Sequence, residues 1–316
     1  MKSRVTKRHI LALTGCLVVG YFMWLIRALG SHPIFYLPCD VQMKKSELQV
    51  WTDSAVNKRV IECHDVPSWT HDVPTVLTYY EPRQEETDYS ADILRLWSNM
   101  WQHHGWNVVV LNESMARTHF MYQDFKEAVA RLPTINSKSY EMNCYMRWLA
   151  YEKWTECTRV PVLVVDYDVL NQGLNPTEWT RLLMGRSTTW DSRLHAEPLC
   201  ALHYPDVPAL VTVNHLGLVR LRTLFMWQAT HCQVYPVSWR EFWPRIHTSD
   251  MMILRDQAES CPFMKLDSYL VSEFGDPYWD TSLVCHFSHH HTHSQGYALQ
   301  WQAMTQHVSS QFTFLL

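Results

Sequence analysis

Three short apolar runs, separated by segments with helical periodicity, organise the first half of the 316-residue chain. The runs are rich in β-branched and aromatic side chains, which favour strands, and they cover residues 73–80, 106–111 and 160–165. The segments between them repeat apolar side chains at helical spacing over residues 93–105, 120–131 and 139–154. Strands that alternate with helices in this way predict an α/β fold, in which helices flank a mostly parallel sheet.

An acidic pair, Asp166 and Asp168, directly follows the third run. Ligands of parallel sheets bind in the crevice at the carboxyl ends of the strands, so both side chains can face a cleft if the backbone bends there. Two neighbouring carboxylates resist joint ionisation, and a divalent cation such as Mg²⁺ or Mn²⁺ removes that repulsion. The pair therefore predicts a cation site for a substrate diphosphate. The alternative is a surface turn with two solvated acids.

The amino terminus has the pattern of a membrane anchor. Four basic residues within the first eight precede an uncharged stretch, residues 10–26, which is at the lower limit for crossing a bilayer. Basic flanks stay cytoplasmic, so the body of the protein is expected in the lumen. A cleaved signal peptide is the alternative, because Ala28 and Gly30 have cleavage-site spacing. We expect a cytoplasmic tail (1–9), a transmembrane signal anchor (10–29), a stem or irregular lead-in (30–70) and a catalytic domain (71–316).

Composition excludes several classes of protein. With 47% hydrophobic and 18% charged residues the chain can bury a large core, and its net charge of -4 argues against nucleic acid as a partner. Eight cysteines outside the apolar stretch can pair into disulfides in an oxidising compartment, and none forms a CxxC pair of the zinc-ribbon or thioredoxin kind. A glycosylation sequon begins at Asn112. The chain has no G-x-S-x-G, P-loop or H-E-x-x-H motif.

Several segments resemble the GT-A type glycosyltransferases that use nucleotide-diphosphate sugars. They are TVLTYY, GWNVVVL, YEMNCYMRWLAYEKW and VLVVDYDV, within about residues 73–170. The resemblance is to the Golgi type II membrane class, and the Arg-containing helix before a strand and D-x-D is similar to Och1-like mannosyltransferases. It implies a Rossmann-like GT-A sheet behind a single transmembrane helix, a nucleotide-diphosphate sugar as donor, and Mn²⁺ or Mg²⁺ as cofactor. The acceptor would be a glycan, glycoprotein or glycolipid in the Golgi or ER.

The resemblance also implies roles for individual residues. Asp168 would ligate the metal directly, while Asp166 would contact the metal or the nucleotide ribose. Thr78 and Tyr80, at the end of the first run, would lie near the base and ribose. Arg147, on the helix before the acidic pair, would reach the donor sugar or diphosphate, because arginine suits bidentate recognition of oxygen. The alternative for Arg147 is an exposed helix residue or a salt bridge.

A histidine cluster occupies residues 286–293. Many GT-A enzymes complete the metal shell with a carboxy-terminal histidine that follows a short strand, and imidazole is an ordinary ligand for Mn²⁺. Residues 283–287 have the pattern of such a strand, which makes His286 the first choice and His289 the second. The alternative is a flexible polar loop that binds metal ions without function.

A general base for the acceptor hydroxyl is sought among the carboxylates of the second half, which are Glu241, Asp250, Asp256, Glu273 and Asp276. We select Asp250, because it precedes an apolar helical start at Met251. The same position suits a helix N-cap, which is the competing interpretation.

These patterns predict a metal-dependent, hexosyltransferase-like enzyme of the secretory pathway. One alternative is a metal-dependent hydrolase that uses the histidine cluster of residues 286–293 together with Asp166 or Asp168. The other is a non-catalytic carbohydrate-binding or interaction protein, with exposed tryptophans as binding platforms.

Overall fold

A computed structural model describes residues 74–82, 89–134, 136–184, 198–204, 208–231, 248–256, 270–277, 279–287 and 297–311. The expected anchor and stem lie outside these residues, as do Glu241 and His289. A search of the described part for a helix long and apolar enough to cross a membrane found none. The boundaries expected for the tail, anchor, stem and catalytic domain stay predictions.

A five-stranded sheet lies at the centre of the described structure, with the strand order β2-β1-β3-β6-β5. Its strands are β1 (Thr75–Tyr79), β2 (Asn107–Leu111), β3 (Val162–Val165), β5 (Cys200–Leu202) and β6 (Leu210–Val213). Strand β1 pairs in parallel with β2 and β3, whereas β6 runs antiparallel to both β3 and β5. The expected α/β architecture is confirmed, and the sheet is mixed because β6 runs opposite to the other four strands.

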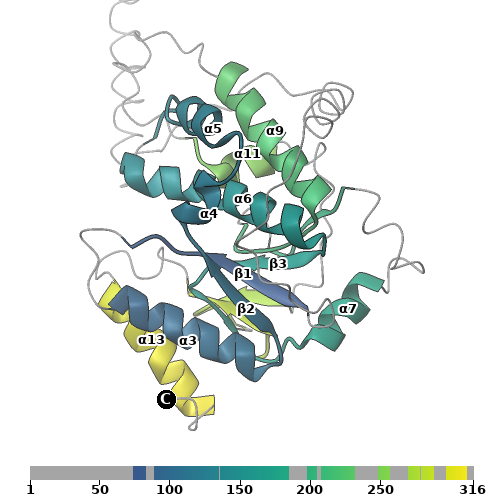
Figure 1. The fold of residues 1–316 in the computed structure, drawn as a ribbon. Helices are drawn as coiled ribbons and strands as arrows, with labels where there is room; N and C mark the ends of the chain where they lie inside the picture. The colour runs from purple at the N-terminus through teal and green to yellow at the C-terminus, as the bar shows by residue number, and fades with distance from the viewer. Residues whose placement is uncertain are drawn as a thin grey trace, which may run out of the picture.

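Helices cover both faces of this sheet (Figure 1). On one face lie α4 (Glu113–Arg117), α5 (Tyr122–Val129), α6 (Lys138–Thr158), α9 (His215–His231) and α11 (Asp250–Asp256). The other face is covered by α3 (Tyr89–His103), α13 (Tyr297–Gln311) and a second sheet. Helix α7 (Pro176–Met184) lies at one side of the molecule in this view.

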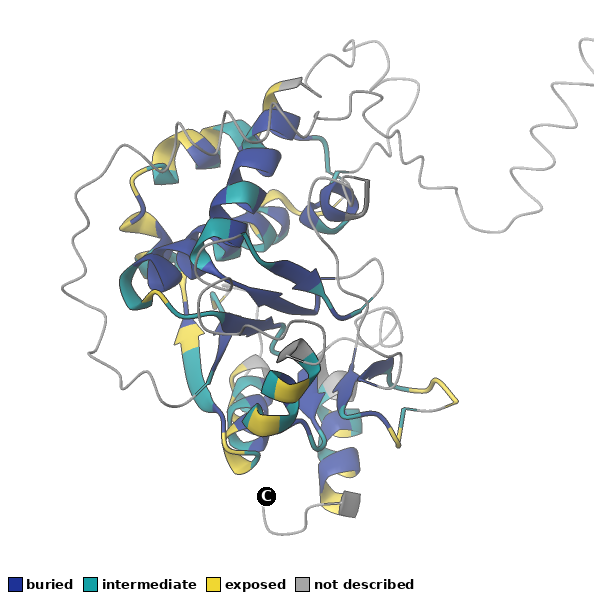
Figure 2. Ribbon diagram, turned by 90° about the vertical axis from the view of Figure 1, so that its right-hand side faces the viewer, coloured by how far each residue is buried: buried dark blue, intermediate teal, exposed yellow. Residues whose placement is uncertain are grey.

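Two hydrophobic cores result, one on each face of the central sheet. Because successive side chains of a strand point to opposite faces, Leu77 enters the core beneath α6 while Val76 enters the core beneath α3. Figure 2 shows most strands of the central sheet as a buried layer between partly exposed helices, whereas the edge strand β2 is half-buried to exposed. Tryptophans serve as core residues here, since Trp97, Trp101 and Trp148 are all at most 1% exposed.

The second sheet has three strands in the order β4-β8-β7. They are β4 (Val169–Asn171), β7 (Val271–Glu273) and β8 (Val284–His286), and β8 pairs with β4 antiparallel and with β7 in parallel. Strand β4 begins four residues after the end of β3, so the chain passes from one sheet to the other through the acidic pair. This passage is what brings residues of the two sheets to a common site.

Gly217 lies where the first turn of α9 meets Leu199, the residue that precedes β5. The side chain of Asn214 accepts hydrogen bonds from both backbones, from Gly217 N at 2.8 Å and from Leu199 N at 2.9 Å. A Cβ added at position 217 would lie 1.8 Å from the carbonyl oxygen of Leu199. No side chain fits there without a backbone shift.

We therefore expect Gly217→Ala to lower the free energy of unfolding by about 1–3 kcal/mol, as overpacking in a closed space does. Urea denaturation followed by circular dichroism measures it. Gly173→Ala is the matched control, because its added Cβ would meet Leu283 Cδ2 at an ordinary 3.4 Å. Equal effects of the two substitutions would contradict the close approach at Gly217.

Candidate functional site

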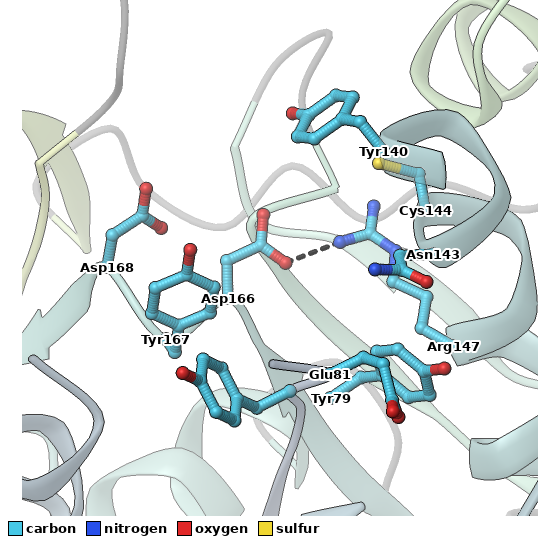
Figure 3. A pocket seen from close by; sticks show the side chains of 10 residues that line it. Tyr79, Glu81, Tyr140, Asn143, Cys144, Arg147, Asp166, Tyr167 and Asp168 are labelled. Carbon is cyan, nitrogen blue, oxygen red and sulfur yellow. Dashed lines mark hydrogen bonds and ion pairs between the residues drawn. The ribbon is translucent and has the colours of Figure 1, made fainter. Parts of the chain in front are cut away.

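A pocket opens where the carboxyl ends of β1 and β3 meet the first turns of α6 (Figure 3). Its empty volume is about 600 Å³, which includes the open solvent at its mouth. Three segments line it: the residues after β1, one face of α6, and the turn after β3. The lining residues are Tyr79, Tyr80, Glu81, Tyr140, Asn143, Cys144, Arg147, Asp166, Tyr167 and Asp168.

The acidic pair lies in a tight turn whose two ends are held by different sheets. Asp166 N donates to Ala209 O at 3.0 Å, which continues the ladder beside β6. Val169 N donates back to Asp166 O at 3.0 Å and closes the turn, and Phe287 N donates to Asp168 O at 2.9 Å beside β8. The backbone therefore bends at the pair, as the sequence interpretation required. Both carboxylates reach the same pocket.

Charges of the same sign meet at this turn. Burial raises the pKa of Asp166, and the Asp168 carboxylate raises it further, while the Arg147 guanidinium acts in the opposite direction. The net effect is a pKa of Asp166 above its ordinary value. A cation bound between the two carboxylates would offset this repulsion.

Arg147 is held between two carboxylates. Its Nη1 donates to Asp166 Oδ1 at 2.5 Å, while its Nε and Nη2 donate to Asp250 Oδ2 at 3.1 and 2.6 Å. The side chain is 11% exposed, which excludes the interpretation of a solvated helix residue. Arg147 therefore lines the pocket and forms salt bridges, while its contact with a donor sugar or diphosphate stays a prediction (Figure 3).

The structure does not support Asp250 as the general base. Asp250 is 1% exposed and does not line the pocket, and its Oδ2 also accepts from Trp148 Nε1 at 2.9 Å. An enclosed carboxylate whose oxygen already accepts from two side chains cannot take a proton from a hydroxyl in the pocket. The capping interpretation is off by one residue, because Ser249 Oγ accepts from Met252 N at 3.4 Å.

His286 is delivered to the acidic pair by β8. The predicted strand is confirmed, and it places His286 Nε2 3.7 Å from Asp168 Oδ1. On the other side of the ring, Nδ1 lies 3.6 Å from Glu273 Oε1 on β7. Burial alone would lower the pKa of His286, but Asp168 and Glu273 outweigh it and the pKa is raised.

The structure places the other candidate carboxylates in different surroundings. Glu273 lies beside His286, whereas Asp276 is exposed and accepts from Glu273 N at 3.3 Å in a turn. Asp256 ends α11. Within the described ranges, no three side chains of His, Cys, Asp or Glu are grouped so that they could hold a metal ion by themselves.

Of the two residues expected near the nucleotide base, one lines the pocket and the other does not. Tyr80 lines the pocket, and its ring contacts that of Tyr167 edge to face with centroids 5.6 Å apart. Thr78 is fully buried and does not line the pocket. A direct contact from Thr78 to a nucleotide, as predicted, does not agree with this position.

Sequence interpretation missed the face of α6 that lines the pocket. Tyr140, Asn143 and Cys144 precede Arg147 at helical spacing and share its face. The same spacing, counted back from Arg147, could have identified them. Cys144, Cys200 and Cys285 are free thiols, whereas Cys157 is disulfide-bonded.

No protein-family model matches the sequence, and no curated protein matches it. Among solved structures, a match is a glycosyltransferase involved in the glycosylation of the major capsid of PBCV-1, with 13% identity and a TM-score of 0.42 over 74% of this chain and 99% of that chain. Another is mouse xyloside xylosyltransferase 1 in its apo form, with 11% identity and a TM-score of 0.37 over 73% of this chain and 93% of that chain. Both TM-scores are below 0.5, so the site itself must carry any functional conclusion.

Glu141 lies on α6 close to the charges of the site. Burial raises its pKa to about 7, although a hydrogen bond from Asn136 Nδ2 lowers it, and the Asp250 carboxylate raises it further. The unfolded chain releases this proton near the ordinary pKa of 4.5, while the folded chain retains it up to about pH 7. Stability contributed at low pH is therefore lost as the pH rises through this window.

We expect the free energy of unfolding of the wild type to fall between pH 4.5 and pH 7 relative to that of Glu141→Gln, by on the order of 1–3 kcal/mol. Urea denaturation at several pH values measures both proteins. Glutamine keeps the oxygen that accepts from Asn136, so the hydrogen bond of 2.5 Å is conserved in kind. Parallel pH profiles for the two proteins would contradict the raised pKa.

Proposed function

We propose that this protein is a metal-dependent glycosyltransferase, which transfers a sugar from a nucleotide-diphosphate donor to a glycan, protein or lipid acceptor. The observation that carries the proposal is the turn at Asp166 and Asp168, which presents two carboxylates to the pocket with His286 beside them. Such a group of oxygen and nitrogen ligands suits a divalent cation.

The charges of the pocket support a cation requirement. Three carboxylates line it, those of Glu81, Asp166 and Asp168, and the positive charge of Arg147 is already shared with Asp250. A nucleotide diphosphate brings further negative charge, which these carboxylates would repel. A cation that is bound by both partners removes this repulsion, so we expect the donor to bind as its metal complex.

The residues present fit such a cation. Asp168 and His286 would hold it, with Asp166 as a further ligand or a contact to the donor, and diphosphate oxygens would complete the coordination shell. Mn²⁺ suits the imidazole better than Mg²⁺, which prefers oxygen ligands. When bound, the cation neutralises the charge that develops on the departing diphosphate.

The chain's own side chains would do the positioning. The rings of Tyr80 and Tyr167, which contact each other, offer apolar surface in the lining of the pocket. Such a surface suits a nucleotide base or a sugar ring. Arg147 orients Asp166 through their ion pair, and Glu273 faces the second nitrogen of His286, an arrangement that fixes ring orientation in many metal sites. The lumen of the Golgi or ER, expected from the amino-terminal pattern, is the compartment we propose.

The first test is nucleotide binding. We expect the full chain, purified in detergent, to bind UDP or GDP at least about tenfold more tightly with Mn²⁺ than without it, and Asp168→Asn to lose this dependence. Isothermal titration calorimetry with each nucleotide, with and without Mn²⁺, measures the effect and shows which nucleotide base the site binds.

Asp92→Asn is the matched control, because it makes the same chemical change in a partly exposed residue of α3 that does not line the pocket. It should bind like the wild type. Binding that is insensitive to Mn²⁺, or to the substitution of Asp168, would refute the proposal. Tight Zn²⁺ binding without nucleotide binding would point to the hydrolase instead, and glycan binding that survives Asp168→Asn to a non-catalytic module.

A further inference from the structure

We propose that Asp250 is a positioning residue for the cation site: it acts on Asp166 through Arg147 and keeps that carboxylate available to the metal. The inference rests on the function proposed above. Asp250 comes from α11, 84 residues after Asp166, and it contacts neither the pocket nor the acidic pair.

The hydrogen bonds of Arg147 divide unequally between its two partners. Asp250 Oδ2 accepts from two of the guanidinium nitrogens, Nε and Nη2, whereas Asp166 Oδ1 accepts from Nη1 alone. The guanidinium also lies over the ring of Trp148, with Cζ 5.2 Å from the ring centroid. Arg147 is thus anchored to the Asp250 side and reaches Asp166 with one end.

The two ion pairs also differ in their surroundings. The Asp250 side chain is 1% exposed, and the Asp166 side chain is 26% exposed at the pocket. Water screens a charge pair at the pocket more strongly than an enclosed one, so Arg147 is held mainly by Asp250. Arg147 therefore neutralises the charge of the Asp166 carboxylate only in part, and this carboxylate can also serve as a ligand of a metal cation.

Removing the charge of Asp250 would change this division. Arg147 would then have Asp166 as its remaining anionic partner and would bind it more closely. A carboxylate paired in this way competes poorly for Mn²⁺, because the guanidinium and the metal repel each other and share the same oxygens. The consequence is a loss of metal affinity from a substitution that touches neither the metal nor the nucleotide.

The carboxylate of Asp250 is fixed by its own helix, α11, and by α6. Its Oδ1 accepts from Met251 N at 2.9 Å, and Trp148 Nε1 donates to its Oδ2 at 2.9 Å. A separate contact joins the same two segments without charge: Tyr145 Oη donates to Thr248 O at 3.3 Å. This second contact allows the structural and electrostatic contributions of the junction to be tested apart.

The experiment compares Asp250→Asn with Tyr145→Phe in the full chain. The affinity for Mn²⁺ is measured by calorimetry at a saturating concentration of the nucleotide that the wild type binds, and Tm is measured for each protein. We expect Asp250→Asn to weaken Mn²⁺ binding about tenfold, the scale for outer-shell partners of metal ligands. Tyr145→Phe should lower Tm while Mn²⁺ affinity stays within about twofold of the wild type.

A double-mutant cycle adds a readout that general destabilisation would not move. In an Asp166→Asn background, Asp250→Asn should have no further effect on Mn²⁺ affinity, because the carboxylate through which it acts is gone. If Asp250→Asn does not fold, Asp250→Glu replaces it, which keeps the charge but displaces it by one methylene, and Mn²⁺ affinity should again fall.

The experiment distinguishes a failure of the positioning role from a failure of the proposed function. Wild-type Mn²⁺ affinity in a folded Asp250 variant, or equal losses in both Asp166 backgrounds, would overturn the positioning role and leave the proposed function intact. A wild-type protein without Mn²⁺-dependent nucleotide binding would overturn the proposed function and this inference with it.

Discussion

The turn between β3 and β4 is the constraint on which the rest of the site depends. Asp166 belongs to the ladder of one sheet through Ala209 and Asp168 to the ladder of the other through Phe287. A shift of this turn would break hydrogen bonds in both sheets, so the two carboxylates have little freedom to separate. Because α6 approaches the turn from one side and β8 from the other, the acidic pair lies between a guanidinium and an imidazole. Tertiary structure, and not the pair alone, makes the position a candidate cation site.

Helix α6 supplies the rigid support for this arrangement, and it does so with buried charges that are paired. Glu152 is bonded to Arg222 on α9 at 2.8 Å and lies 3.1 Å from His119 Nε2, and its side chain is 2% exposed. Burial alone would raise the pKa of Glu152, but Arg222 and His119 outweigh it and the pKa is lowered. Buried pairs add little net stability, yet losing one partner is costly, so they specify how the helices dock. The register of α6 against α9 is thereby set, and with it the place where Arg147 meets the turn.

Local patterns in the sequence were sufficient for β1, β2, β3, α6 and the position of the acidic pair, because each is encoded within one stretch of residues. The short strand that carries His286 was found for the same reason. The antiparallel strands β5 and β6 were not predicted, since the pairing of β6 with β3 joins segments that lie far apart in the sequence. The partner of Arg147 was missed for a related reason: Asp250 is 103 residues away, and its own sequence context resembled a helix cap. The pairing of a buried charge depends on packing, which spacing along the chain does not reveal.

In the proposed function, the binding of the cation and the binding of the donor would be linked. The described residues would supply few of the cation's ligands, so the donor's oxygens would complete the shell, and each partner would raise the affinity of the other by the same factor. Arg147 would set the strength of that coupling, because any charge that it gives to Asp166 is charge that the cation would no longer neutralise. The enclosed Asp250 holds most of the charge of Arg147 away from the pocket. The fold thus keeps the pocket acidic, as the binding of a donor together with a cation would need, while an arginine stays within reach of the oxygens that such a complex would bring.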